Sequence, residues 1–132
     1  MQSIRVSLFG SRAAALLALL SLLAGCNNCE KLTERVCSEL GDDCALWKEI
    51  GGPDDIIPGG AKVNRACGEY LDDELTLDSV INTARGKVLI ERLNRAVKTG
   101  DKAEADEVKG ELDENRKRIE AGIEKVKQRT GR

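Results

Sequence analysis

Hydrophobic residues recur at intervals of three or four over most of the chain, which is the periodicity of amphipathic helices. In the first half this spacing predicts three short helices, at residues 29–40, 44–50 and 61–71. We expect Asn28 to cap the first helix and Gly41 to end it, and Asp42 or Asp43 to cap the second. The apolar positions of the three helices are Cys29, Leu32, Val36, Cys37, Leu40, Leu46, Trp47, Ile50, Val63, Ala66, Cys67, Tyr70 and Leu71.

Two longer stretches with the same periodicity follow. The first covers about residues 77–99. We expect Thr76 to begin this helix and Gly100 to end it. The second begins after Asp101, which forms a capping-box-like pair with Glu104, and extends for roughly 28 residues or about 42 Å. The apolar stripe of the first comprises Leu77, Val80, Ile81, Ala84, Val88, Leu89, Leu93, Ala96 and Val97. The predicted fold class is therefore all-α: a small disulfide-stapled helical domain followed by a charged antiparallel helical hairpin.

The last predicted helix carries a weak coiled-coil pattern. Its a positions are Ala105, Leu112, Ile119 and Val126, and its d positions are Val108, Asn115 and Gly122, with Ile123 beside the seam. Two of the three d positions are not apolar, so the seam is weak. The other faces are charged, and Asp113–Lys117 and Glu114–Arg118 have the spacing of helical ion pairs. The stripe either packs narrowly on its neighbour or receives another chain, which would be a second copy or a different envelope protein.

Residues 51–60 separate the second and third short helices. Two pairs of glycines and two prolines predict a loop here. We expect Ile56 and Ile57 to fold back onto the helices, and the alternative is an apolar tip that meets a partner. The aspartate pairs of the chain do not have the close spacing of a calcium loop, so capping and turns explain them.

The start of the chain has a different pattern. Residues 1–12 contain Arg5 and Arg12 and no acidic residue, and residues 13–23 form an unbroken run of small and apolar side chains. Such a run is too short to span a bilayer, which needs roughly 20 residues, but it suits the apolar region of a signal peptide. It leads into the tetrapeptide Leu23-Ala24-Gly25-Cys26.

The order of a basic start, an apolar run and this tetrapeptide resembles the signal peptide and lipobox of bacterial lipoproteins. The resemblance covers residues 1–26 and implies that residues 1–25 are removed and that Cys26 receives lipid on its thiol. Each buried methylene contributes about 0.8 kcal/mol, so two or three acyl chains hold a protein on a membrane. In such lipoproteins an aspartate directly after the lipidated cysteine retains the protein in the inner membrane. Asn27 stands at that position here, so the resemblance favours the outer membrane. The alternatives are an ordinary secretory leader or an uncleaved anchor.

Four cysteines remain once Cys26 is lipidated: Cys29, Cys37, Cys44 and Cys67. An even number in an exported protein predicts two disulfides. A four-thiolate zinc site usually needs two C-x-x-C hooks, and these four cysteines contain none. A thioredoxin-like redox pair needs one C-x-x-C, and that spacing occurs here only between Cys29 and the lipidated Cys26. Of the three possible pairings we prefer Cys37–Cys44 with Cys29–Cys67, because residues 29 and 37 are too far apart along one straight helix.

The composition argues against several functions. The chain has no histidine, 21 basic and 23 acidic residues, and a net charge of −2, so a common catalytic base and a nucleic-acid-binding charge are both missing. No nucleophile motif or phosphate loop is present, and Trp47 and Tyr70 are the aromatic residues beyond the leader. We therefore expect no catalysis, no cofactor, no metal and no nucleic acid.

The sequence thus divides into a signal peptide at 1–25, a disulfide-linked three-helix region at 26–73 and a helical hairpin at 74–132. The expected function is that of a lipid-anchored cell-envelope protein with a structural or protein-interaction role, held close to the membrane through Cys26. The alternative is a lipoprotein inhibitor or immunity-type protein that blocks a partner enzyme, for which Asp54 to Ile57 would form the plug. Self-association through the hairpin is a further expectation.

Overall fold

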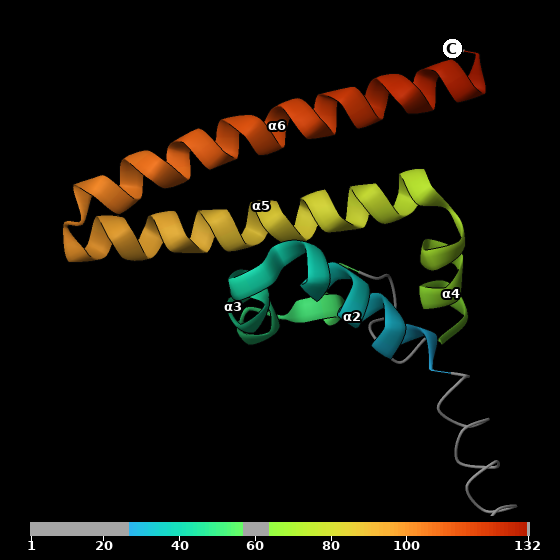
Figure 1. The fold of residues 1–132 in the computed structure, drawn as a ribbon, viewed down its shortest axis with the longest axis horizontal. Helices are drawn as coiled ribbons and strands as arrows, with labels where there is room; N and C mark the ends of the chain where they lie inside the picture. The colour runs from blue at the N-terminus through green and yellow to red at the C-terminus, as the bar shows by residue number, and fades with distance from the viewer. Residues whose placement is uncertain (1–26, 57–63, 132) are drawn as a thin grey trace, which may run out of the picture.

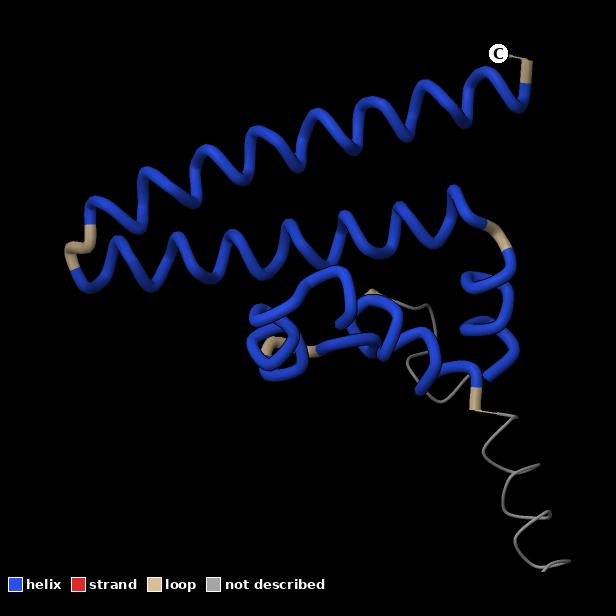
Figure 2. The backbone as a smooth tube through the Cα atoms, viewed as in Figure 1, coloured by secondary structure: helices blue, strands red, loops and turns tan. Residues whose placement is uncertain are grey.

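The computed structural model describes residues 27–56 and 64–131, which form helices and short turns and contain no strand (Figures 1 and 2). The predicted all-α class is confirmed. The elements are α2 (Asn28–Leu40), the 3-10 turn η1 (Gly41–Asp43), α3 (Cys44–Glu49), the 3-10 turn η2 (Gly52–Asp55), α4 (Asn64–Asp72), α5 (Glu74–Thr99) and α6 (Lys102–Thr130). The predicted lipidation site, Cys26, and the leader lie outside the described residues, as do Ile57 and Val63 of the predicted loop and third helix.

The first helix begins one residue earlier than predicted. Asn27, not Asn28, is the N-cap residue of α2, and its side chain accepts a hydrogen bond from the backbone N–H of Glu30. Asn28 is already helical, and its backbone N–H donates to Oδ1 of Asn64 at 2.6 Å. This bond ties the start of α2 to the start of α4.

The predicted aspartate cap of the second helix is confirmed in position but not in its hydrogen bond. Asp43 is the N-cap residue of α3, at the end of the 3-10 turn that joins α2 to α3, but its side chain makes no capping hydrogen bond. A cap residue normally leaves the helical conformation, but Asp43 stays close to it with φ −76° and ψ −6°. Its carboxylate instead accepts a hydrogen bond from Arg92 of α5 at 3.4 Å.

Two disulfides hold the short helices together, in the pairing preferred from the sequence. Cys29 of α2 is bonded to Cys67 of α4 across 38 residues, and Cys37 of α2 is bonded to Cys44 of α3 across 7 residues. The Cα–Cα distances are 4.9 and 4.8 Å, within the usual range for such bonds. The bridges stabilise a core that is otherwise small for an independently folded domain.

The hydrophobic core is continuous from the short helices into α5. Its buried side chains are Cys29, Leu32, Val36, Leu40, Trp47, Cys67, Val80, Ile81, Ala84 and Val88. Ile56 packs half-buried against this core, as expected for a loop that folds inward. Helix α5 is therefore central, with α2, α3 and α4 against one side and α6 against another (Figure 1).

The hairpin helices are capped largely as the pattern indicates. Helix α5 starts at Glu74 rather than Leu77, because Asp73 and not Thr76 is its N-cap residue; the Asp73 carboxylate accepts from the N–H and the hydroxyl of Thr76. Gly100 ends α5 in the left-handed conformation with φ 73°, and Asp101 caps α6 by accepting from the N–H of Glu104 at 3.0 Å.

Val97 was predicted to belong to the apolar stripe of α5, but its side chain is 66% exposed. The face of α5 that meets α6 is instead centred on Leu89 and Ala96, which are buried.

Arg92 of α5 connects three elements. Its guanidinium forms ion pairs with Asp43 of η1 and with Glu104 and Glu111 of α6, at 2.8 to 3.4 Å. Glu104 is thereby held by Arg92, so its carboxylate does not close the expected capping box.

Candidate functional site: an open groove in the helical hairpin

The hairpin is closed over one half of its length and open over the other. Near the connecting turn, α6 buries Ala105 and Val108 against α5. Beyond Asn115, the apolar residues of α6 are no longer buried: Ile119 is 41% exposed, Ile123 51% and Val126 46%. Figure 1 shows the two helices diverging toward the C-terminus of α6. Of the predicted a positions, Ala105 is therefore buried and Leu112 partly buried, whereas Ile119 and Val126 are exposed.

The helices diverge because the face of α5 toward α6 changes from apolar to polar. Following this face from Leu89 toward the start of α5, the positions at successive turns are Gly86, Asn82 and Ser79, while Val80, Ile81 and Ala84 are buried in the core with the short helices. Leu75 and Ile81 are the apolar residues that α5 contributes to this region, and they leave the isoleucines of α6 half-exposed.

Asn115 marks the point where the seam opens. This d-position side chain is 3% exposed, and its Nδ2 donates to the backbone carbonyl of Asn82 at 3.0 Å, while its Oδ1 has no hydrogen-bond partner. Gly86 of α5 allows this approach, because a Cβ atom there would lie 3.3 Å from Asn115 Nδ2. The next d position, Gly122, has no side chain to fill the seam.

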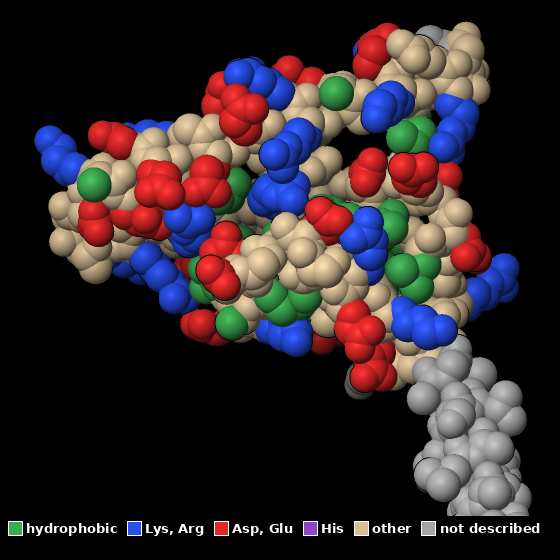
Figure 3. Space-filling view, in the orientation of Figure 1, with side chains coloured by type: hydrophobic (Ala, Val, Ile, Leu, Met, Phe, Trp, Pro, Cys, Tyr) green, Lys and Arg blue, Asp and Glu red, His purple; other side chains and the backbone are tan. Residues whose placement is uncertain are grey.

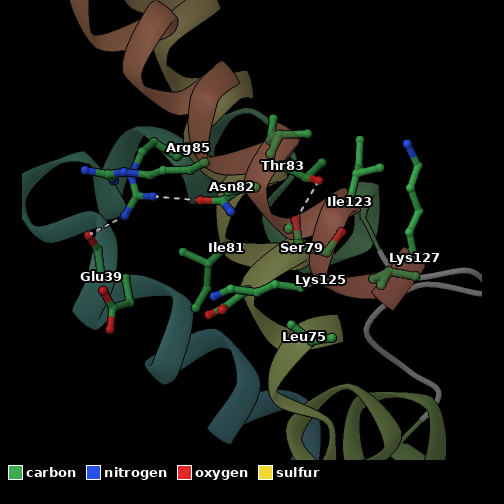
Figure 4. Close-up of a pocket in the computed structure, with 16 residues that line it drawn as sticks. Glu39, Leu75, Ser79, Ile81, Asn82, Thr83, Arg85, Ile123, Lys125 and Lys127 are labelled. Atoms are coloured by element: carbon green, nitrogen blue, oxygen red, sulfur yellow. Dashed lines mark hydrogen bonds between the residues drawn. The ribbon is translucent and has the colours of Figure 1, made fainter. Parts of the chain in front are cut away.

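The open half forms a groove of about 560 Å³. Figure 3 shows the surface hollowed between α6 and α5 toward their open end, and Figure 4 shows the side chains that surround it. From Leu75 to Arg85, eleven residues of α5, the ten rises between them give the groove a length of about 15 Å. Its main walls come from α5 (Leu75, Asp78, Ser79, Ile81, Asn82, Thr83, Arg85) and α6 (Arg118, Ile119, Ala121, Gly122, Ile123, Lys125, Val126, Lys127), with Glu39 of α2.

Two arginines lie at the inner end of the groove. Arg85 donates from Nη1 to Oδ1 of Asn82 at 3.1 Å and from Nη2 to the backbone carbonyl of Glu39 at 3.4 Å (Figure 4). The pKa of Arg85 lies below the ordinary guanidinium value, first because burial disfavours its charge and second because Arg118 is a neighbouring cation, while Glu39 acts in the opposite direction.

Arg118 does not form the helical ion pair that its spacing suggests. Glu114 pairs with Lys117 at 3.0 Å, and Lys117 also forms the predicted pair with Asp113 at 3.3 Å. Arg118 instead lines the groove beside the apolar row. The prediction of a Glu114–Arg118 pair is therefore wrong.

An ion pair spans the outer end of the groove. Arg129, near the end of α6, donates to Oδ1 of Asp73 at 2.8 Å, directly at the start of α5. Hydrogen bonds from the Thr76 hydroxyl and from Arg129 lower the pKa of Asp73 from 3.8 to about 2. The hairpin is thus fixed at its turn and tied again at its open end, with the groove between these points.

The remaining predicted residues lie away from the groove. The disulfides join α2 to α3 and α4. In the described part of the sequence-predicted plug, Asp54 and Asp55 are exposed, Asp55 pairs with Lys87 of α5, and Ile56 is half-buried. The sequence did not predict the groove itself. Its d positions Asn115 and Gly122, which are not apolar, were the features that indicated a poorly packed seam.

Comparisons with known proteins give no relative: no protein-family model matches the chain, and neither a curated protein nor a solved structure matches it. In residues 27–56 and 64–131, no three His, Cys, Asp or Glu side chains form a group that could hold a metal ion. Over the same ranges, no helix has the length and apolarity needed to cross a membrane.

Proposed function

We propose that this protein is a lipid-anchored cell-envelope protein that binds a partner protein in the groove of its hairpin. The observation that carries the proposal is the row of Ile119, Ile123 and Val126, which faces a groove instead of a packed seam. Apolar rows that are rimmed by charge and left half-exposed on a small domain are typical of interaction surfaces. Catalysis is not expected, since the groove walls hold no nucleophile with an adjacent base.

The membrane anchor is supported by the lipobox-like residues 23–26. Cys26 directly precedes Asn27, the N-cap residue of α2, so a lipid there would hold the folded body near the membrane without a long tether. Asn28 contacts Asn64 at the start of α4, and α4 leads over nine residues, about 14 Å, to Asp73 at the mouth of the groove. The anchor would therefore lie at the same end of the molecule as the open end of the hairpin.

Replacing the anchor residue tests the membrane part of the proposal. Cys26→Ser should move the protein out of the membrane fraction, because no acyl chain would hold it. Mass spectrometry of the native product should find residues 1–25 removed and lipid on Cys26. Retention of Cys26→Ser in membranes, or an unmodified thiol in the native product, would show that the anchor is absent.

Photo-crosslinking in intact cells tests the groove. A benzophenone amino acid at Ile123 should give a discrete adduct with another protein, whereas the same amino acid at Ile90 should not. Ile90 is a matched control, because it is an isoleucine of the same hairpin with similar exposure, 54% against 51%, but lies outside the groove. Equal adducts from both positions, or none from Ile123, would overturn the proposed role of the groove.

A further inference from the structure

The two arginines of the groove are unusual in this protein. Among the arginines of residues 27–56 and 64–131, six form an ion pair with a carboxylate within 4.0 Å: Arg35, Arg65, Arg92, Arg95, Arg116 and Arg129. Arg85 and Arg118 form none, although each has an acidic residue one turn away or on a packed element. The protein thus leaves two guanidinium groups without a carboxylate at one place, the inner end of the groove.

The groove is also positively charged along its α6 wall. Lys125 and Lys127 lie on the wall toward the outer end, and Lys127 has only a 3.9 Å pair with Glu124. The acidic lining residues are fewer: Asp78, and Glu39, whose carboxylate is already paired with Arg35 at 2.6 Å. Since the whole chain has a net charge of −2, this positive wall is a local feature that suits an anionic occupant.

The apolar row between these cations has the spacing of a helix-binding surface. Ile119, Ile123 and Val126 follow each other at i, i+4 and i+7 on α6, and the groove is about 15 Å long, which is close to three helical turns. We infer that the groove binds an amphipathic helix of a partner protein that carries carboxylates beside its apolar face, with Arg85 and Arg118 pairing with a carboxylate at the inner end. This inference rests on the proposed function and names the partner's chemistry.

Two other occupants fit less well. A lipid acyl chain needs an enclosing pocket, but the three groove residues of α6 are each more than two-fifths exposed. A helix covers such residues with its apolar face and keeps its polar face in water. A second copy of this hairpin would bring its own Arg118 and Lys125 against the same cations, and this repulsion disfavours a dimer through the groove.

The inference can be tested with synthetic peptides and the full-length lipoprotein in phosphatidylcholine nanodiscs. The probe is a fluorescent amphipathic peptide of about five helical turns, with leucines at i, i+4 and i+7 and glutamates flanking them. Its partner probe has lysines in place of the glutamates. The variants are Arg118→Glu and, as a matched control, Arg116→Glu, which reverses a nearby arginine on the same helix that is outside the groove and already paired with Asp113 and Glu120.

The glutamate peptide should bind saturably to the wild type and not to empty nanodiscs. Arg118→Glu should weaken this binding roughly tenfold or more and should favour the lysine peptide, because a charge-assisted pair becomes a repulsion. Arg116→Glu should change the affinity by less than about twofold. Both variants should keep the wild-type circular dichroism spectrum, which separates a lost contact from a lost fold.

Several results would overturn the inference. These are equal binding of both peptides, equal effects of Arg118→Glu and Arg116→Glu, displacement of the glutamate peptide by phosphatidylglycerol vesicles, or a concentration-dependent dimer that Arg118→Glu alters. Each would leave the Ile123 crosslink free to support the broader role of the groove, so that failure of the partner chemistry can be told from failure of the proposed function.

Discussion

At the scale of single residues, Asp73 connects the stability of the fold to the open end of the hairpin. Its carboxylate caps α5 through Thr76 and pairs with Arg129 of α6. Its pKa of about 2 in the folded protein is below the ordinary 3.8, so the charged form stabilises the fold. This contribution is fully present above about pH 4 and is lost as the pH falls through 2.

Asp73→Asn should therefore destabilise the protein near neutral pH and make little difference in acid. Asparagine keeps the ability to cap a helix, so the change mainly removes the charge that pairs with Arg129. Urea unfolding of both proteins should show a gap in unfolding free energy that closes between about pH 4 and pH 2. A gap that stays constant over this range would mean that the charge does not contribute.

Two glycines of the hairpin should respond in opposite directions to alanine. Gly100 has φ 73°, where an L-residue is strained, so Gly100→Ala should cost about 1–2 kcal/mol. Gly110 lies within α6 with open space around its Cα, so Gly110→Ala should stabilise the protein by roughly 0.5–1 kcal/mol. Urea unfolding midpoints would measure both, and a Gly100→Ala variant as stable as the wild type would refute the left-handed turn.

At the scale of elements, the sequence predicts helices better than their ends. The spacing of apolar residues locates each of the α-helices found in residues 27–56 and 64–131, because one buried face is a strong and repeated signal. The caps at Asn27 and Asp73 are missed, since several capping residues stand next to one another and tertiary contacts decide between them. Asn28, for example, contacts α4 instead of capping α2.

The two disulfides should contribute unequally. Replacing Cys29 and Cys67 by alanine opens a loop of 38 residues and should cost about 4 kcal/mol, whereas replacing Cys37 and Cys44 opens a loop of 7 residues and should cost about 2 kcal/mol. The reason is that a longer loop restricts the unfolded chain more. Guanidinium unfolding monitored by circular dichroism would compare the variants, and equal losses would show that loop length is not the cause.

At the scale of the whole molecule, the groove arises because α5 packs against the short helices on one side and against α6 on another. Val80, Ile81, Ala84 and Val88 are buried in the core with α2, α3 and α4, whereas Leu89 and Ala96, nearer the connecting turn, are buried on the side of α6. The sequence shows the weak seam at Asn115 and Gly122 but not which face of α5 is already occupied. Knowing this needs the arrangement of helices that are far apart in the chain, which periodicity alone does not provide.

Amide hydrogen exchange along α6 of the purified full-length protein tests most directly whether the hairpin is open. The first half of the helix, which buries Ala105, Val108 and Asn115, should exchange slowly, and the half from Ile119 onward should exchange much faster, because half-exposed side chains stabilise it less. Protection that continues undiminished to the last turn of α6 would mean that the two helices pack along their whole length and that no groove is available to a partner.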